Sequence, residues 1–400
     1  MRLQFVVNVA LIVGATVARP VMDSNAAAHA TLDNLASIAR RNQDSFFFGA
    51  YMQRPNGKTC TKSNMLVRKE WGSLSSEERI AYTDAVLCFQ KKAPLTPTSL
   101  IPGVRSRYDD FVGTHINQTQ NIHYTGTFLA WHRYFTWMYE KALRDECGYT
   151  GAQPYWNWGL FSNDTTSGPV FDGSATSMSG NGLYIPGRGD LTLALPGHRD
   201  VLISAANGGG CVSSGPFKNM TVNLGPSALP LNGGKSQTGS GLDYNPRCLT
   251  RDISSKVNDK FANATAILDL ITENWDIDSF QTVLQGVPGS GSLGVHGGGH
   301  FTIAGDPAAD GFASPGDPAF YLHHSMVDRV WWMWQMQDPK KRLKAISGTG
   351  TFLNIPPSPN TTLETPVDMG YAATPGYGPV AMKDLMSITA GPFCYTYDSL

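Results

Sequence analysis

Six histidines in two spaced groups constrain this chain more than any other feature of its sequence. The 400 residues contain only nine histidines in total. The first group is His115, His123 and His132, and the second group is His296, His300 and His324. Neutral imidazole suits zinc, copper, iron and nickel, whereas magnesium and calcium require carboxylates, which are scarce around these positions. The pattern predicts a fold that gathers six imidazoles around transition-metal ions.

The spacing within the second group is compatible with two structures. His296 and His300 lie four residues apart and share one face if the segment is helical. Their spacer is Gly297-Gly298-Gly299, and each glycine costs a helix about 1 kcal/mol relative to alanine. Helix propensity alone therefore predicts a loop with two incidental histidines, whereas a bound metal would supply the missing free energy. The spacer lacks the glutamate of the H-E-x-x-H pair, so a single-metal hydrolase is the weaker alternative.

The third histidine of each group lies in a strongly predicted helix. His132 falls within Phe128–Arg144, a segment of high apolar density without glycine or proline. His324 falls within Pro318–Gln337, which follows Asp317 with proline at the first helical position. Both histidines are therefore expected on helices.

A phenylalanine precedes each of these two histidines by one helical turn, Phe128 in one helix and Phe320 in the other. A single histidine in an apolar helix is usually a core residue, but two in matching aromatic contexts favour metal ligands. Arg133 and Asp328 are expected to orient the imidazoles through hydrogen bonds or ion pairs.

The rest of the chain indicates a helical core surrounded by loops. Further helices are expected over Thr31–Arg41, after a capping Ser75 or Ser76, and over Val257–Leu270. Residues 159–250 and 346–380 are rich in Gly, Pro, Ser, Asn and Thr and predict long ordered loops. No period of about 20 to 50 residues recurs, which excludes a repeat architecture. The predicted fold class is mainly α, with a helix-bundle core wrapped by long Gly/Pro-rich loops and a few short strands.

Composition excludes several classes of partner. The formal net charge is −1, with 31 basic and 32 acidic residues, so the chain has no long-range field to attract nucleic acid or an anionic membrane. The chain is 41% hydrophobic, as a globular protein is. At helical spacing, its clustered aromatic side chains are expected to pack the core. They are Tyr134, Phe135, Trp137, Trp331, Trp332 and Trp334.

The N-terminus has the layout of a secretory signal peptide. Met1 and Arg2 precede a short apolar run from Leu3 to Val17, which ends on small residues such as Ala18. We expect residues 1–18 to be removed, leaving residues 19–400 as a soluble, secreted chain without a membrane span. A buried N-terminal helix is the alternative.

Six cysteines in a chain with a secretory start predict disulfides. They are Cys60, Cys88, Cys147, Cys211, Cys248 and Cys394. None forms a C-x-x-C pair, which argues against a thiolate metal site. Six cysteines allow 15 pairings, of which we favour Cys211 with Cys248 and Cys60 with Cys394. Glycosylation sequons at Asn117, Asn163, Asn219, Asn263 and Asn360 agree with secretion.

Two long segments resemble the copper signatures of the tyrosinase, catechol oxidase and hemocyanin superfamily. The first is His123-x4-Phe128-Leu-x-Trp-His132-Arg133-x2-Thr-x3-Glu140, and the second is Asp317-Pro-x-Phe320-Tyr-x2-His324-x3-Asp328. Arg68 and Tyr395-Thr-Tyr397 resemble the pair that joins the two ends of the catalytic domain in this family. The similarity runs from about Arg68 to Tyr397, and fungal short-form enzymes are the nearest type.

The resemblance implies a type 3 centre of two copper ions. It assigns one copper to the first histidine group and the other to the second group. The resemblance gives His323 no ligand role, because neighbouring residues on a helix point in different directions and His324 is the ligand. The implied fold is a helix bundle with both triads facing inward. Residues 19–400 then form a single tyrosinase-like catalytic domain, without the C-terminal shielding domain of latent members.

Several positions depart from the family pattern around the metals. Asn121 replaces the cysteine that many fungal members link to the second histidine. Gly297 replaces an asparagine that helps to hold a proton-accepting water, and Gln285 matches the usual glutamate. Gly311 stands where a bulky gate residue often covers the second copper. Access to that copper is therefore expected to be wide, unless Phe312 fills the space. The remaining residues expected near the metals or the substrate gate are Phe128, Phe301 and Phe320.

The resemblance implies an oxidase of phenols with dioxygen as co-substrate. Two Cu(I) ions each give one electron, and imidazole tolerates both oxidation states. The expected reaction converts o-diphenols to o-quinones, with o-aminophenols and, more weakly, monophenols as further substrates. The alternative is a reversible dioxygen carrier like hemocyanin, which needs the same six histidines but a blocked entrance.

Overall fold

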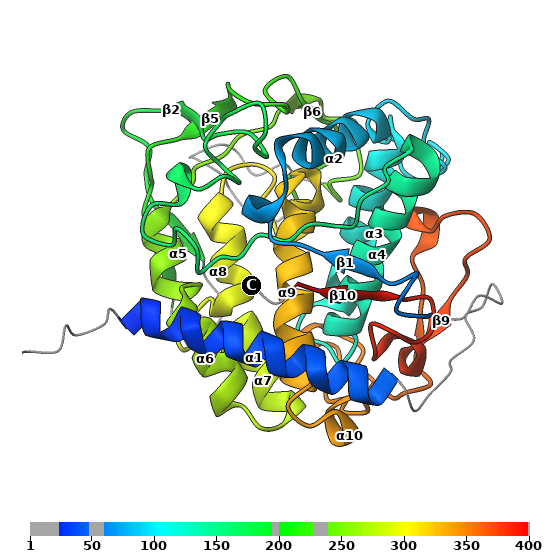
Figure 1. The fold of residues 1–400 in the computed structure, drawn as a ribbon. Helices are drawn as coiled ribbons and strands as arrows, with labels where there is room; N and C mark the ends of the chain where they lie inside the picture. Colours follow the sequence, from blue (N-terminus) through cyan, green and yellow to red (C-terminus); the bar gives the residue numbers. More distant parts are fainter. Residues whose placement is uncertain (1–23, 48–59, 194–199, 228–238, 399–400) are drawn as a thin grey trace, which may run out of the picture.

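Two long helices, α4 (Phe128–Cys147) and α9 (Ala319–Gln335), form the centre of the computed structural model (Figure 1). The structure describes residues 24–47, 60–193, 200–227 and 239–398. The two helices pack through aromatic side chains, and the rings of Tyr139 and Tyr321 stack with centroids 3.4 Å apart. This contact places the metal-ligand candidates of both helices on facing surfaces.

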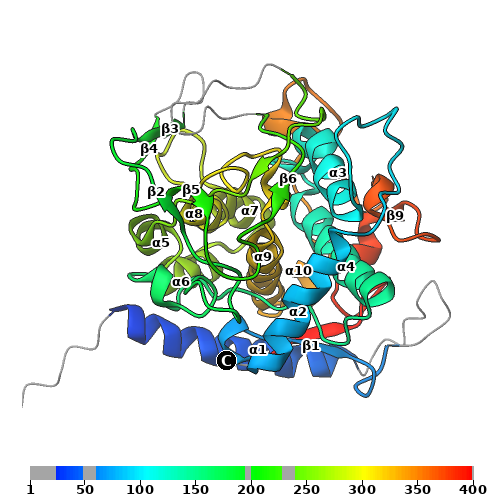
Figure 2. The same ribbon diagram turned by 90° about the horizontal axis from the view of Figure 1, so that it is seen from above.

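Eight further helices surround this pair. They are α1 (Ser24–Phe47), α2 (Ser76–Phe89), α3 (Arg107–Ile122), α5 (Ser255–Phe261), α6 (Ala264–Glu273), α7 (Ile277–Gln285), α8 (Gly294–Ile303) and α10 (Pro339–Arg342) among the described residues. Short 3₁₀ turns are η1 (Trp71–Ser73), η2 (Thr165–Ser167), η4 (Ser314–Gly316), η5 (Phe352–Asn354), η6 (Gly370–Ala372) and η7 (Met382–Leu385). In both views α3 runs beside α4, and α8 lies on the other side of α9 (Figures 1 and 2).

The strands are short and pair in twos. The pairs are β1 (Leu66–Arg68) with β10 (Tyr395–Tyr397), β2 (Gly182–Tyr184) with β5 (Gly209–Val212), β3 (Leu191–Leu193) with β4 (Val201–Ile203), β6 (Thr221–Val222) with β7 (Arg247–Cys248), and β8 (Pro366–Val367) with β9 (Val380–Ala381). The predicted fold class, mainly α with few short strands and long loops, is confirmed.

Helix positions agree with the sequence predictions where apolar periodicity is strong. The Ser75 side chain caps α2 in a reciprocal box with Glu78. The single helix predicted over Val257–Leu270 is wrong, because the chain breaks between α5 and α6. There the Asn263 side chain accepts a hydrogen bond from the Ala266 N–H and starts a new helix.

The clustered aromatic residues pack the core, as predicted. Tyr134, Phe135, Trp331, Trp332 and Trp334 are buried, and Trp137 packs against them partly buried. Among the described residues no helix is both long and apolar enough to cross a bilayer. The predicted signal peptide, residues 1–18, lies outside the described residues.

Three disulfides pair all six cysteines. Cys60 bonds Cys394 and Cys211 bonds Cys248, so both favoured pairings are confirmed. The third bond joins Cys88 of α2 to Cys147 at the end of α4. Cys394 directly precedes β10, which pairs in parallel with β1, so covalent and hydrogen-bonded links join the same two segments.

A buried ion network fixes this junction to α9. The Asp328 carboxylate accepts hydrogen bonds from Arg133 at 2.5 Å and from Arg68 at 3.3 Å. The hydroxyls of Tyr395 and Tyr397 donate to the same carboxylate, at 2.6 and 2.5 Å. Arg68 also pairs with Glu140 of α4 at 2.6 Å. The first and last described strands are thereby tied to the two central helices.

Candidate metal centre

Four helices bring the six histidines together. In the first group, His115 lies on α3, His123 follows the end of α3, and His132 lies on α4. In the second group, His296 and His300 lie on α8 and His324 lies on α9. Within each group the candidate ligand atoms all lie within 4.8 Å of one another. The structure therefore assembles both predicted triads.

The two groups face each other across a narrow gap. The His132 and His324 rings stack with centroids 4.5 Å apart and planes 14° apart. The ring centroids of His123 and His296 lie 6.0 Å apart. A single buried site therefore contains both groups.

Two phenylalanines lie against this site, as their place one turn before a histidine predicted. The Phe128 ring centroid is 4.9 Å from both the His132 and His296 centroids. The Phe320 centroid is 4.1 Å from that of His324 and 5.5 Å from that of His115. Each phenylalanine contacts both groups, so the walls between them are apolar.

Backbone carbonyls orient the imidazoles of the first group. Their Nδ1 atoms lie 2.7 Å from the Phe312 oxygen for His115, 3.0 Å from the Thr119 oxygen for His123, and 2.8 Å from the Phe128 oxygen for His132. Because a carbonyl only accepts, Nδ1 carries the proton and Nε2 presents a lone pair. The Nε2 atoms of His115 and His132 are buried without a hydrogen-bond partner, as expected of atoms reserved for a metal.

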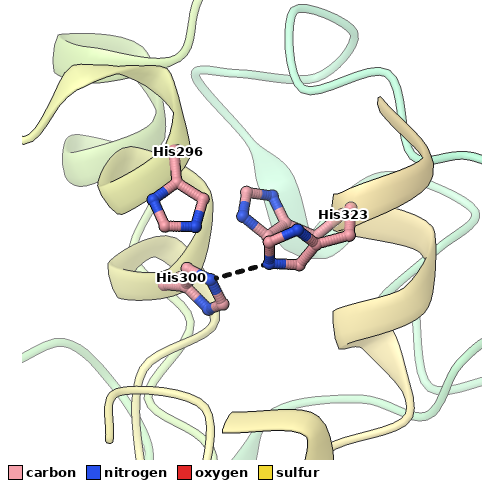
Figure 3. Close-up of side chains that lie close together, drawn as sticks. His296, His300 and His323 are labelled. Carbon is pink, nitrogen blue, oxygen red and sulfur yellow. Dashed lines mark hydrogen bonds between the residues drawn. The ribbon is translucent and has the colours of Figure 1, made fainter. Parts of the chain in front are cut away.

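The second group differs, because two of its three Nε2 atoms lie within hydrogen-bond distance of each other. The Nε2 atom of His296 is buried without a partner, and the Nε2 atoms of His300 and His324 lie 3.2 Å apart. Two nitrogen ligands of one tetrahedral ion, each about 2.0–2.1 Å from the metal, lie about 3.3 Å apart. Figure 3 shows His296 and His300 on successive turns of one helix, with His323 opposite them. The nitrogen donors therefore suit a transition-metal ion.

His323 lies closer to this group than the sequence predicted. Its ring centroid is 4.4 Å from that of His300, and its nitrogens belong to the same cluster of candidate ligand atoms. Both of its ring nitrogens are buried. The expectation that His323 points elsewhere is wrong, because α8 packs over the side of α9 that carries it.

Close packing explains the glycine spacer of α8. A Cβ atom on Gly299 would lie 2.3 Å from the His323 ring, and one on Gly298 would lie 2.8 Å from the Phe261 Cβ. Neither position has room for a side chain. The loop predicted from helix propensity is wrong, because tight contact with α9 and α5 outweighs the low helix propensity of glycine.

Arg133 and Asp328 do not orient the histidines. Arg133 donates to Asp328, to the Gln335 side chain and to the backbone of Leu385 and Met386. Asp328 accepts from the arginines and tyrosines of the ion network. The predicted orienting role is wrong for both side chains, and the backbone carbonyls described above take it in the first group.

Burial keeps the imidazoles neutral. Loss of solvent lowers the pKa of His123 to about 4 and that of His300 to about 3. The same cause, followed by repulsion between neighbouring histidines, lowers the pKa of His115, His132 and His324. At neutral pH the lone pairs are therefore free to bind a cation.

A pocket of about 350 Å³ opens onto both groups, at His123, His296 and His300. It is also lined by the predicted gate and neighbour residues Gln285, Gly297, Phe301, Gly311 and Phe312. A Cβ on Gly311 would meet no atom within 4 Å, so this position leaves the pocket open.

Tyr124, which the sequence reasoning missed, ties the pocket wall to the first group. Its N–H donates to the Gln285 Oε1 atom at 2.7 Å, and its hydroxyl donates to the Gln285 and Gly286 carbonyls at 2.8 and 2.9 Å. The Gln285 Nε2 atom donates to the Gln281 carbonyl. Only the position of Tyr124 next to His123 could have signalled this role.

Comparison with known proteins places the chain in a family. Residues 105–337 match the common central domain of tyrosinase. The chain is 42% identical to Tyrosinase P of Aspergillus terreus, over 83% of this chain and 91% of that protein. It is 37% identical to N-acetyl-6-hydroxytryptophan oxidase ivoB of Emericella nidulans, over 85% and 94% of the two chains.

A solved structure agrees with these relatives. A mutant of the polyphenol oxidase from Thermothelomyces thermophila is 43% identical and superposes with a TM-score of 0.82, covering 93% of this chain and 98% of that one. Sequence family, fold and paired histidine clusters all agree. The chain is therefore a copper oxidase of phenols that belongs to the tyrosinase family, the type 3 dicopper polyphenol oxidases.

Proposed function

We propose that this chain holds two copper ions and oxidises o-diphenols to o-quinones, so that two diphenols reduce one dioxygen to two waters. The first group would hold one ion and the second group the other. The observation that carries the proposal is the pair of facing histidine groups, in which the Nε2 atoms of His115, His132 and His296 are buried without a hydrogen-bond partner. Bound copper would supply the one-electron steps that dioxygen reduction requires.

The protein around the metals contributes binding and exclusion of water. Phe128 and Phe320 pack against the histidine rings. Phe301 and Phe312 line the pocket, so a phenol ring entering there is desolvated beside the histidines. The carbonyls on the Nδ1 atoms hold the imidazoles of the first group in one tautomer and orientation.

We propose a preference for diphenols over monophenols, because the pocket is poor in proton acceptors. The Gln285 oxygen is occupied by the Tyr124 N–H, and Gly297 has no side chain. No carboxylate belongs to the described residues that line the pocket. A monophenol, whose hydroxyl must lose its proton, therefore lacks a base there.

Three measurements test this function. Metal analysis should find two copper ions per chain, and oxygen uptake should accompany quinone formation from catechols. Dopamine should be turned over much faster than tyramine, which lacks one hydroxyl. Equal turnover of the two amines would contradict the diphenol preference, and activity with zinc alone would contradict the copper proposal. The comparisons give no support to the dioxygen-carrier alternative.

A single substitution tests the missing base directly. Gly297→Asn should raise the tyramine-to-dopamine rate ratio, because an amide at this position would hold a water as proton acceptor. The new Cβ would lie 3.2 Å from the Leu293 Cβ, so that side chain must move slightly. Gly378→Asn is the matched control, since a Cβ there meets no atom within 4 Å. An unchanged ratio in a folded, copper-loaded Gly297→Asn variant would contradict the reasoning.

We also propose that the chain is secreted. The signal-like residues 1–18 and the three disulfides both favour an oxidising compartment. Expression in a fungal host should deliver the chain to the medium, with its N-terminus after residue 18. Retention of the intact chain in the cytosol would contradict this proposal.

A further inference from the structure

The outer part of the pocket is built from apolar side chains of four separate segments. Strands β3 and β4 contribute Leu193 and Val201, the loop between α7 and α8 contributes Val287, and η5 contributes Phe352. The Phe352 ring packs edge-on against that of Tyr124, with centroids 5.2 Å apart. These residues line the same pocket as His123, His296 and His300, and Val287 is exposed at its surface. We infer that a substrate enters along this path.

Charge is absent from this path over the part of the chain that the structure describes. No Asp, Glu, Lys or Arg belongs to the described lining residues. The polar side chains among them are neutral, such as Thr119, Ser292 and Gln285, and the Gln285 amide is already hydrogen-bonded at both ends. Among the described lining residues, a charged substituent would therefore meet no counterion.

The pocket volume, about 350 Å³, falls near the lower end of the range of roughly 300–1,000 Å³ for small-molecule sites. It has room for a catechol ring together with a substituent. When the ring reaches the histidines, the substituent remains between the apolar walls. There a carboxylate or ammonium group loses its hydration without gaining an ion pair from the described lining residues. An ester or amide gives up much less hydration free energy.

We propose that the enzyme selects o-diphenols whose side chain is uncharged, and discriminates against both anionic and cationic side chains. The inference rests on the proposed diphenol oxidation. It concerns the uncharged pocket walls and not the metal ligands. The positive charge of the copper ions alone would give a different selection, because it would favour anionic substrates over cationic ones.

Two matched substrate pairs test the selection. Dihydrocaffeic acid is compared with its methyl ester, and dopamine is compared with N-acetyldopamine, at neutral pH with the copper-loaded enzyme. In each pair we expect kcat/KM to be higher for the uncharged partner by about tenfold or more. Equal efficiency within either pair, or a preference for the acid, would overturn the selection. Failure to oxidise any of the four compounds would instead contradict the proposed function.

A charged residue introduced into the pocket wall tests whether the selection arises at that wall. Val287 is 41% exposed at the pocket, and Val287→Lys should raise kcat/KM for dihydrocaffeic acid relative to its ester. Val283→Lys is the matched control, because Val283 is 36% exposed one turn earlier and does not line the pocket. The inference is overturned if both lysines shift the ratio equally, or if neither does. Copper content and the unfolding temperature verify that both variants are folded.

Discussion

Asp328 is the residue whose replacement tests the packing of this fold most severely. Its carboxylate, buried on α9, accepts hydrogen bonds from the side chains of Arg133, Arg68, Tyr395 and Tyr397. Asp328→Asn keeps the shape of the side chain but removes its charge. Arg68 then keeps Glu140 as its carboxylate partner, whereas Arg133 keeps only neutral acceptors, the Gln335 side chain and two backbone carbonyls. Loss of one partner of a buried ion pair costs about 3–5 kcal/mol.

The loss in free energy of unfolding can be measured by denaturant unfolding at neutral pH. We expect Asp328→Asn to lower the free energy of unfolding by about 3–5 kcal/mol, a large part of the roughly 5–15 kcal/mol of a typical domain. Asp44→Asn is the control, because Asp44 pairs with Lys62 at 2.9 Å with both side chains about half exposed. That variant should lose no more than about 1 kcal/mol.

The pH dependence supplies a second, independent readout. Burial alone would raise the pKa of Asp328, but the charges of Arg133 and Arg68 outweigh it and hold the pKa below its usual value. The stabilisation is therefore complete above the unfolded pKa of about 3.9 and is lost as the pH falls through the folded pKa. The difference between Asp328→Asn and the original chain should shrink as the pH falls below about 3.9. The reasoning is refuted if the two aspartate variants cost the same at neutral pH, or if the difference grows in acid.

Three further predictions concern the metal site and its supports. Chelator-treated protein should lose stability as the pH falls below about 6.5, because the imidazoles of the unfolded chain then bind protons. The buried imidazoles bind protons only near pH 4 at His123 and near pH 3 at His300. Denaturant unfolding across this pH range should show the decline, and a flat profile would contradict it. Replacing both Cys60 and Cys394 by serine should lower the free energy of unfolding by about 2–5 kcal/mol, and an unchanged unfolding midpoint would argue against a stabilising bond. Tyr124→Phe removes the donor of two carbonyls and should cost about 1–2 kcal/mol while raising the KM for catechol more than it lowers kcat, a split that steady-state kinetics would reveal or exclude.

The two central helices were predictable because their signals are local. Residues 128–144 and 318–337 combine dense apolar periodicity with clear end signals, and the structure places α4 and α9 there. Helix α3 was not predicted, because its residues include many polar side chains. Its one distinctive signal is the capping pair of Ser106 and Asp109.

The histidine groups were predictable in identity but not in their surroundings. Residue type and spacing marked the six imidazoles, yet the groups that orient His115, His123 and His132 are main-chain carbonyls. Any residue has a carbonyl, so no sequence pattern marks these partners. The helical form of α8 was likewise hidden, because it depends on contact with α9, which propensity does not report.

The pairing of β1 with β10 has a consequence for the order of events during synthesis. The Tyr397 hydroxyl donates to the Ser325 carbonyl, next to His324, and Cys60 and Cys394 are separated by 334 positions. Contacts between such distant segments form late. We therefore expect the helix that carries His324 to reach its final setting only after β10 has left the ribosome and paired with β1. A nascent chain arrested before β10 has emerged should therefore retain copper poorly, and a chain arrested after β10 has emerged should retain it.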